Sequence, residues 1–341
     1  MFTVLLGKLQ RREDLTVDEA AGAMAEIMEG RAASSQIAAL LVGLAMKGER
    51  PAEIVGLARA MRHRAAKLPL PAGITDVFDT CGTGGDGAET FNVSTAAALA
   101  VAACGVPVAK HGNRSVSSRC GSADVFESLG VKIDASPEVA SRCLAQAGIA
   151  FLFAPAFHPS MKHAAATRKE LGIRTAFNLL GPLTNPAGAA RQLVGVPRPE
   201  LTELVARSLA MLGTKRAWVV HGADGLDELS TTGYSKVSEC RDGAVNTFYL
   251  HPAEFGLPTS SRGDLRGLDA TGNAEIIRSI LAGAPGAPRD IVLYNAAASL
   301  LIAGRVATLQ EGVTLAAEAI DSGTAAGVLD RLVGTSQEAA A

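Results

Sequence analysis

The sequence predicts an α/β protein with a small N-terminal helical domain and a larger domain with a mainly parallel central sheet covered by helices. Three observations support this prediction. The first seventy residues contain only helical patterns, strand and helix patterns alternate from Thr75 onward, and glycines cluster directly after the first strand pattern. Strands that alternate with helices form parallel sheets, and the helices cover the faces of those sheets.

The N-terminal segment is expected to form a group of short amphipathic helices. Thr16 followed by Glu19 is a capping box, and apolar side chains recur after it at helical spacing. A second apolar helix is expected to end at Gly48, and Pro51 begins a third. Because the stretch 68–73 is rich in proline and glycine, we predict that a linker follows these helices.

Six short apolar runs are candidate strands. Helical patterns lie between most of them, including one that Ser136 caps and Pro137 begins. The candidate strands are residues 76–79, 106–109, 131–133, 149–153, 192–196 and 217–220. We therefore divide the chain into a helical domain (1–70, with a contribution from about 160–186), an α/β domain (71–159 and 187–335) and a frayed tail (336–341).

Composition and charge exclude several classes of protein. A length of 341 residues with 48% hydrophobic residues indicates a soluble globular protein of about two domains. The 32 Lys and Arg residues against 34 Asp and Glu argue against a nucleic-acid partner. No apolar run is long enough to span a bilayer, and the N-terminus lacks the basic region of a secretory signal. Five cysteines without metal-binding spacing are typical of reduced thiols, so we expect a cytoplasmic protein.

The run Gly82-Thr-Gly-Gly-Asp-Gly87 follows the first predicted strand. Its bare backbone N–H groups, next to a helix N-terminus, are suited to holding phosphate; a tight turn without a ligand is the alternative. A dinucleotide site needs an acidic residue at the end of the second strand, where this chain has Lys110 and His111. An NAD site is therefore disfavoured, NADP stays open, and the absence of the Walker A lysine pattern excludes a P-loop.

Two further segments follow predicted strands and complete a phosphate site. The stretch from Lys110 to Ser122 combines cations, serines and glycines, and we interpret it as a second oxyanion clamp; a solvated polar loop is the alternative. Two adjacent phosphate sites suit a sugar phosphate that also carries a diphosphate. A diphosphate leaving group commonly needs Mg²⁺, for which Asp227, Glu228 and the Ser94 hydroxyl are candidate ligands. A solvated acidic loop and ordinary helix capping are the alternatives for these residues.

Taken together, these motifs resemble the anthranilate phosphoribosyltransferase family over nearly the whole chain. The resemblance rests on residues 82–87, 92–95, 110–114, 121–124, 174–186 and 226–229. It implies the fold of the nucleoside phosphorylase-type phosphoribosyltransferases and a homodimer formed through the helical domain. It also implies Mg²⁺-dependent transfer of the 5-phosphoribosyl group of 5-phosphoribosyl 1-diphosphate to anthranilate, with release of diphosphate, in tryptophan biosynthesis.

The resemblance also implies a role for each matching residue. The sugar donor would be bound by Gly82, Gly85, Asp86, Thr90, Asn92, Val93, Ser94, Thr95, Lys110, His111, Gly112, Asn113, Arg114, Ser115, Val116, Ser117, Ser118 and Ser122. Anthranilate would be held by Gly82, Asn113 and Arg168, with Arg168 on its carboxylate. Ser94, Asp227 and Glu228 would hold Mg²⁺, with two ions expected per subunit. No general base is assigned, because holding the amine in line and neutralising the leaving group are expected to supply most of the catalysis.

Two other functions stay open at this point. A pyrimidine nucleoside phosphorylase has a similar fold but needs neither the Asn113 and Arg168 pair nor the Asp-Glu motif. A non-enzymatic, nucleic-acid-binding paralogue of the same fold would be basic and would have lost its site residues. This chain has a net charge of −2 and retains those residues.

Overall fold

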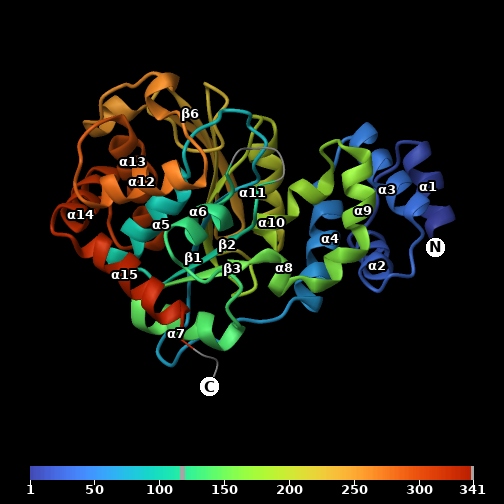
Figure 1. Cartoon of the computed structure of the whole chain (residues 1–341). Helices are drawn as coiled ribbons and strands as arrows, with labels where there is room; N and C mark the ends of the chain where they lie inside the picture. Colours follow the sequence, from blue (N-terminus) through green and yellow to red (C-terminus); the bar gives the residue numbers. More distant parts are fainter. Residues whose placement is uncertain (116–119, 339–341) are drawn as a thin grey trace.

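The computed structural model describes residues 1–115 and 120–338 and confirms the predicted fold class. A helical part lies beside a larger part built on a sheet (Figure 1). Thr16 caps the second helix as expected: its hydroxyl accepts the N–H of Glu19, and the Glu19 carboxylate accepts the N–H of Thr16. The helical part contains α1 (Phe2–Gln10), α2 (Val17–Met28), α3 (Ser34–Lys47), α4 (Pro51–Arg64) and α9 (Lys162–Leu171).

The larger part contains a seven-stranded sheet in the order β3-β2-β1-β4-β5-β6-β7. The first five strands pair in parallel, and β6 and β7 are antiparallel. Because β1 lies between β2 and β4, the chain leaves it first toward one edge and later toward the other. Ligands of open α/β sheets bind at such a switch point, beyond the carboxyl ends of the strands. The strands are β1 (Phe78–Gly82), β2 (Val108–Gly112), β3 (Ile149–Phe153), β4 (Arg191–Gly195), β5 (Arg216–Gly222), β6 (Ser235–Arg241) and β7 (Ala244–Leu250).

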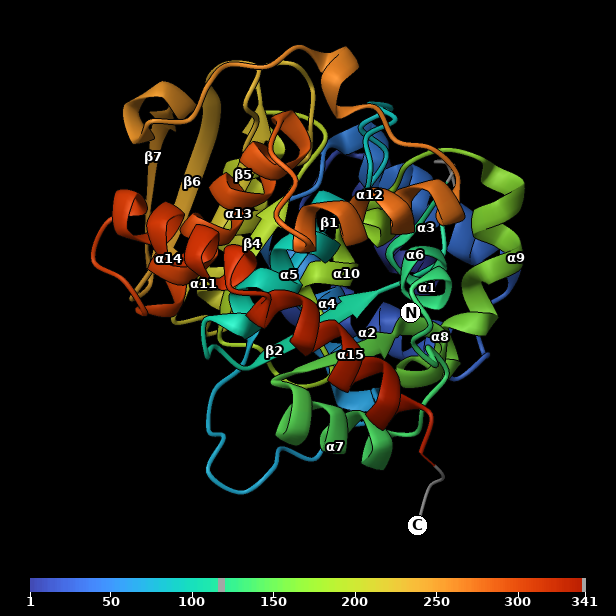
Figure 2. The same ribbon diagram turned by 60° about the vertical axis from the view of Figure 1, so that its left-hand side comes forward.

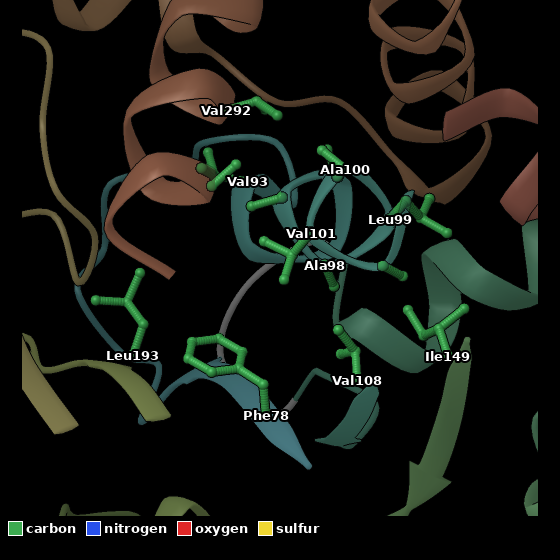
Figure 3. Packing of buried hydrophobic residues seen from close by; sticks show 14 of the residues in the cluster. Phe78, Val93, Ala98, Leu99, Ala100, Val101, Val108, Ile149, Leu193 and Val292 are labelled. Atoms are coloured by element: carbon green, nitrogen blue, oxygen red, sulfur yellow. The ribbon is translucent and has the colours of Figure 1, made fainter. Parts of the chain in front are cut away.

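Helices cover both faces of the sheet. Alternate residues of β5 enter different cores: Trp218 packs with α5 (Val93–Ala103) and α13 (Ala287–Ala303), whereas Val219 packs with α11 (Leu201–Met211) and the N-terminal helices. Figure 3 shows side chains of α5 above Phe78 of β1, and the many alanines of α5 permit this close approach. Figure 2 shows the C-terminal helices gathered with α5 and α13.

Shorter elements complete the fold. The α-helices are α6 (Ser122–Ser128), α7 (Pro137–Ala147), α8 (Ala154–Phe157), α10 (Leu180–Leu183), α12 (Ala270–Leu281), α14 (Leu309–Asp321) and α15 (Thr324–Ser336). The 3₁₀ turns are η1 (Pro159–Met161), η2 (Ala176–Asn178), η3 (Pro252–Phe255) and η4 (Arg262–Leu265). Within the described ranges, no helix is both long enough and apolar enough to cross a bilayer.

Two predictions about the sheet are wrong, and one feature of the sheet was missed. Residues 131–133 form a turn between α6 and α7; their apolar side chains are buried, and periodicity does not distinguish a buried turn from a short strand. The β6–β7 hairpin was not predicted, although Asp242-Gly243 at its turn is a hairpin signal. Strands β1 and β2 also extend beyond their predicted ends to Gly82 and Gly112, so Lys110 lies within β2 and not in the loop after it.

Candidate active site

The glycine loop, residues 82–87, meets the loop that follows β5. The N–H of Gly84 donates to Oδ2 of Asp227 at 2.9 Å, and the N–H of Thr83 donates to the carbonyl of Gly195 at 2.9 Å. Gly195 ends β4, and a β-carbon there would lie 3.1 Å from the Asp227 Cα and closer still to its carbonyl group. The ends of β1, β4 and β5 therefore bring the glycine loop and Asp227 together.

Two carboxylates stand side by side at this edge of the sheet. Oε1 of buried Glu228 accepts the N–H of Ser94, in the first turn of α5, at 3.1 Å. Burial and repulsion by Asp86 raise the pKa of Asp227 to about 7, against the Gly84 hydrogen bond and the charge of Arg174, which lower it. Burial and repulsion by Asp227 likewise raise the pKa of Glu228 to about 8. Ionising both carboxyl groups is therefore unfavourable in this site, and a bound cation would stabilise their ionised forms.

One buried cation already accompanies the carboxylates. Lys110 is 1% exposed, and its ammonium donates to the carbonyl of Thr80 at 2.5 Å and to Oγ of Ser94 at 3.2 Å. Its charge lowers the pKa of Glu228, opposing the effect of burial. Lys110 thus links β2 to the start of α5 beside the glycine loop.

The donor atoms at this edge suit Mg²⁺. Across the described part of the chain, no group of three or more His, Cys, Asp or Glu residues is placed to hold a metal. Mg²⁺ does not require such a group, since it takes one or two protein carboxylates and completes its octahedron with phosphate oxygens and waters. Asp227 and Glu228 supply two such carboxylates, and their pKa values are raised by burial and by repulsion that a cation relieves. The backbone N–H of Ser94 donates to Glu228, and the Ser94 hydroxyl accepts from Lys110.

The predicted second loop begins at the end of β2 and returns to α6. Oδ2 of Asp124 accepts the N–H groups of Ser115 (3.1 Å) and Gly121 (2.8 Å), which holds the two ends of the loop together. The carbonyl of Asn113 accepts the N–H of Ala123 at 3.2 Å and the Ser122 hydroxyl at 3.4 Å. The predicted residues Val116, Ser117 and Ser118 lie outside the described residues.

The Arg114 side chain is held by carboxylates. Its guanidinium forms ion pairs of 2.8 Å with Asp124 and Glu127, on an exposed surface. These pairs would have to open or rearrange for Arg114 to bind a phosphate, so its predicted role needs a different side-chain position.

The remaining predicted donor residues frame the start of α5. Asn92 donates to the carbonyl of Cys120 at 3.2 Å and accepts from the Asn273 amide at 3.0 Å, which ties the loop after β2 to α12. Thr90 forms an isolated bridge with Arg266. Val93 and Thr95 are buried in the first turn of α5, and the Thr95 hydroxyl has no hydrogen-bond partner among the described atoms.

A second group of polar residues lies between β2 and the segment 158–185. Nδ1 of His111 lies 3.1 Å from the carbonyl of Gly181, and its ring centroid is 5.1 Å from that of His158. Burial lowers the pKa of His158 to about 4; burial, together with the neighbouring His158, lowers that of His111 to about 3. Both rings are therefore neutral near pH 7.

Arg168 lies apart from these contacts. Its guanidinium carbon is 5.7 Å from the centre of the Phe177 ring, and burial lowers its pKa. Within residues 1–115 and 120–338, it forms no hydrogen bond or ion pair, including with Asn113. A half-buried arginine without a counter-charge is suited to binding an anion from solution.

Sequence reasoning missed the buried pair Asp79 and Asn185. Oδ1 of Asp79 accepts the N–H of His111 at 3.2 Å, and its Oδ2 accepts the Asn185 amide at 2.8 Å. The same amide donates to the carbonyl of Ala109 at 2.8 Å, so this pair fixes β1, β2 and the segment after α10. An aspartate within an otherwise apolar strand was the available signal, because a carboxylate is rarely buried without partners.

Two known protein families match this chain. The family described as "Glycosyl transferase family, a/b domain" matches residues 74–326, and "Glycosyl transferase family, helical bundle domain" matches residues 3–65. The fold and the site thus define a glycosyl transferase with a helical-bundle domain and an α/β domain.

The individual relatives of this chain show which glycosyl transferases it resembles most specifically. The anthranilate phosphoribosyltransferase of Moorella thermoacetica is 55% identical over 333 residues, covering 98% of both chains. That of Symbiobacterium thermophilum is 53% identical and covers 96% of both. The crystal structure of the Thermus thermophilus anthranilate phosphoribosyltransferase has a TM-score of 0.91 and 43% identity, covering 98% of this chain and 99% of that one. The chain belongs to the anthranilate phosphoribosyltransferase family and is an enzyme of that family.

Proposed function

We propose that this protein transfers the 5-phosphoribosyl group of 5-phosphoribosyl 1-diphosphate to the amine of anthranilate in tryptophan biosynthesis. The products are N-(5-phosphoribosyl)anthranilate and diphosphate, and the reaction depends on Mg²⁺. The observation that best supports this proposal is the hydrogen bond from Gly84 to Asp227, because it joins a loop suited to phosphate to an acidic pair suited to Mg²⁺.

Two solved structures of one relative support both substrates. The anthranilate phosphoribosyltransferase of Saccharomyces cerevisiae, 27% identical with a TM-score of 0.89, was solved in complex with PRPP and Mg. The same yeast enzyme was solved with 4-fluoroanthranilate, at 26% identity and a TM-score of 0.86. Each structure covers 98% of this chain.

The donor would lie at the carboxyl ends of β1, β4 and β5. Those N–H groups of the glycine loop that do not donate to Asp227 or Gly195 would bind phosphate oxygens, and Lys110 supplies a buried positive charge beside them. Asp227, Glu228 and Ser94 would hold Mg²⁺, with two ions per subunit. When bound, Mg²⁺ neutralises charge on the departing diphosphate.

The acceptor would lie toward the helical part. Arg168 has a guanidinium free of hydrogen bonds and ion pairs with described residues, and a planar carboxylate accepts from such a group in bidentate fashion. Asn113 and Gly82 would contact anthranilate nearer the reacting amine. Because the lone pair of an aromatic amine is unprotonated at pH 7, the residues have to position the amine and do not have to deprotonate it before attack.

We also propose a cytoplasmic homodimer that assembles through the helical part. Its first and third helices contact one another and expose large apolar side chains: Met1 is 55% exposed, Val4 65% and Met46 75%. Exposed apolar side chains on two neighbouring helices favour an interface there. Sedimentation of the purified protein would give twice the mass of the chain; a monomer at micromolar concentration would refute this interface.

The activity can be tested with one assay. Adding 5-phosphoribosyl 1-diphosphate and Mg²⁺ to the enzyme with anthranilate should abolish anthranilate fluorescence, and omission of either should preserve it. A parallel reaction with thymidine and phosphate should give no product. Thymine release without loss of anthranilate would replace this proposal with a nucleoside phosphorylase.

A further inference from the structure

Arg174 is anchored in the helical part of the molecule. It lies between α9 and η2, where the N–H of Thr175 donates to Oδ1 of Asn178 at 2.9 Å. The next two residues, Ala176 and Phe177, are buried in the core shared with the four N-terminal helices. The backbone that carries Arg174 is therefore fixed, although its side chain is partly exposed to solvent.

The Arg174 side chain reaches from this anchor to the glycine loop of the sheet-bearing part. A β-carbon on Gly85 would lie only 2.8 Å from the Arg174 Cζ and closer still to Nη1. Gly85 has a φ of +77°, a backbone conformation that favours glycine, and the absence of a β-carbon also leaves room for the Arg174 side chain. The guanidinium thus lies directly on the loop expected to bind phosphate.

The charges around Arg174 place it at the metal-binding end of this loop. Asp227 and Asp86 both attract its guanidinium and raise its pKa, against a larger lowering by burial. Neither carboxylate is in ion-pair contact with it, however: in the described parts of the chain, Arg174 forms no hydrogen bond or ion pair. Its N–H donors therefore lie within the electrostatic influence of the expected Mg²⁺ ligands and have no partner of their own among the described residues.

We propose that Arg174 is a further donor-binding residue, which contacts the diphosphate group of 5-phosphoribosyl 1-diphosphate. This inference rests on the proposed function. A guanidinium presents N–H donors in a planar fork that matches phosphate oxygens, and here the fork lies beside backbone N–H groups and the acidic pair. Arg168, on the same segment, is proposed to hold the acceptor carboxylate. The segment 162–178 then supplies one arginine to each substrate and fixes their relative positions.

A binding experiment isolates this role. Calorimetric titration with Mg²⁺ and inorganic diphosphate would compare the wild type with Arg174→Ala, Arg174→Lys and the control Arg198→Ala. Arg198 is a suitable control because it lies near enough to repel Arg174, is similarly exposed and is already paired with Glu200 at 3.4 Å. We expect Arg174→Ala to weaken diphosphate binding by roughly 10- to 100-fold and Arg174→Lys to restore part of it, because lysine keeps the charge without the planar fork.

Two further measurements exclude a merely structural role. Affinity for ribose 5-phosphate and the KM for anthranilate should stay within about twofold of wild type in Arg174→Ala, while the KM for the diphosphate sugar rises. Unchanged diphosphate affinity, or an equal loss for diphosphate and ribose 5-phosphate, would overturn the inference. A wild-type enzyme that does not consume anthranilate would instead refute the proposed function, so the two failures are distinct.

Discussion

The backbone N–H of Gly84 and the carboxylate of Asp227 are joined by a hydrogen bond of 2.9 Å across 143 residues of sequence. This bond closes the loop after β1 against the loop after β5, at the switch point of the sheet. The next residue after Asp227, Glu228, makes a similar contact: its carboxylate accepts the backbone N–H of Ser94 at 3.1 Å. The two contacts position the acidic pair between a glycine loop and a helix N-terminus, so the loop expected to bind phosphate and the proposed Mg²⁺ ligands belong to one structural unit.

Neutralising the acidic pair should separate activity from folding. We expect Asp227→Asn with Glu228→Gln to reduce Mg²⁺-dependent turnover by at least about 100-fold, because charge on the diphosphate is no longer neutralised. The folded pKa values of about 7 and 8 exceed those of unfolded carboxyls, so the ionised pair destabilises the fold at higher pH. Urea unfolding at pH 8.5 without Mg²⁺ should therefore find the double variant at least as stable as wild type.

The control for the acidic pair is Asp242→Asn, whose side chain is exposed at the β6–β7 turn. It should retain wild-type turnover across the same Mg²⁺ titration. Near-normal rates of the double variant at low Mg²⁺ would remove the proposed metal role.

Arg168 should affect one substrate only. Replacing it with alanine removes the proposed partner of the anthranilate carboxylate, and we expect the KM for anthranilate to rise roughly 10-fold or more. Arg168→Lys should recover little, because an ammonium does not offer the planar fork. Steady-state kinetics with each substrate varied in turn would test this; equal increases in both KM values would show that Arg168 supports the fold and not the acceptor.

Gly195 should be required for the position of Asp227. A methyl group at this residue would collide with the Asp227 backbone, so Gly195→Ala has to displace the loop after β5. A displacement of about 1 Å can cost on the order of 100-fold in rate, and we expect a loss of this size. Gly334→Ala is the matched control, since a β-carbon there meets no atom within 4 Å. Wild-type kinetics for Gly195→Ala would contradict the close approach.

His158 should make the fold sensitive to acid. Its folded pKa of about 4 lies below the unfolded value of about 6.5, so between these values the unfolded chain binds a proton that the folded chain does not. The contribution of His158 to the free energy of unfolding is fully present above pH 6.5 and is lost as the pH falls toward 4. Relative to wild type, His158→Gln should gain about 2 kcal/mol in unfolding free energy between pH 8 and pH 5.

Urea unfolding at the two pH values, with EDTA present, would measure that difference. His63→Gln, at an exposed position, is the control for the loss of a histidine side chain as such. A His158→Gln variant whose difference from wild type is the same at pH 8 and pH 5 would show that His158 is protonated equally in the folded and unfolded chains.

Local signals in the sequence predicted much of the fold. The Thr16 capping box, the Ser136 cap and the helix after Pro51 all appear in the structure, because each depends on neighbouring residues. The strand at 131–133 failed because burial there comes from tertiary packing, which apolar pattern alone does not reveal. Strand ends failed for a related reason: pairing with β3, which is distant in sequence, extends β2 through Gly112.

The candidate site was predictable where its residues share a motif. The glycine loop and the Asp227-Glu228 pair stood out as patterns, and their contact follows from parallel strands that end at one edge. Arg174 was within a recognised run but had no assigned role, because only folding brings it to Gly85, 89 positions earlier in the chain. Asp79 and Asn185 were missed since their link spans 106 residues.

The most direct test of the central claim measures diphosphate release and anthranilate consumption in the same reaction. Purified enzyme with anthranilate, 5-phosphoribosyl 1-diphosphate and Mg²⁺ should release one diphosphate for each anthranilate consumed, and EDTA or the Asp227→Asn, Glu228→Gln double variant should stop both. Diphosphate release that continues without anthranilate consumption, or equal consumption in EDTA, would contradict a Mg²⁺-dependent phosphoribosyl transfer at this site.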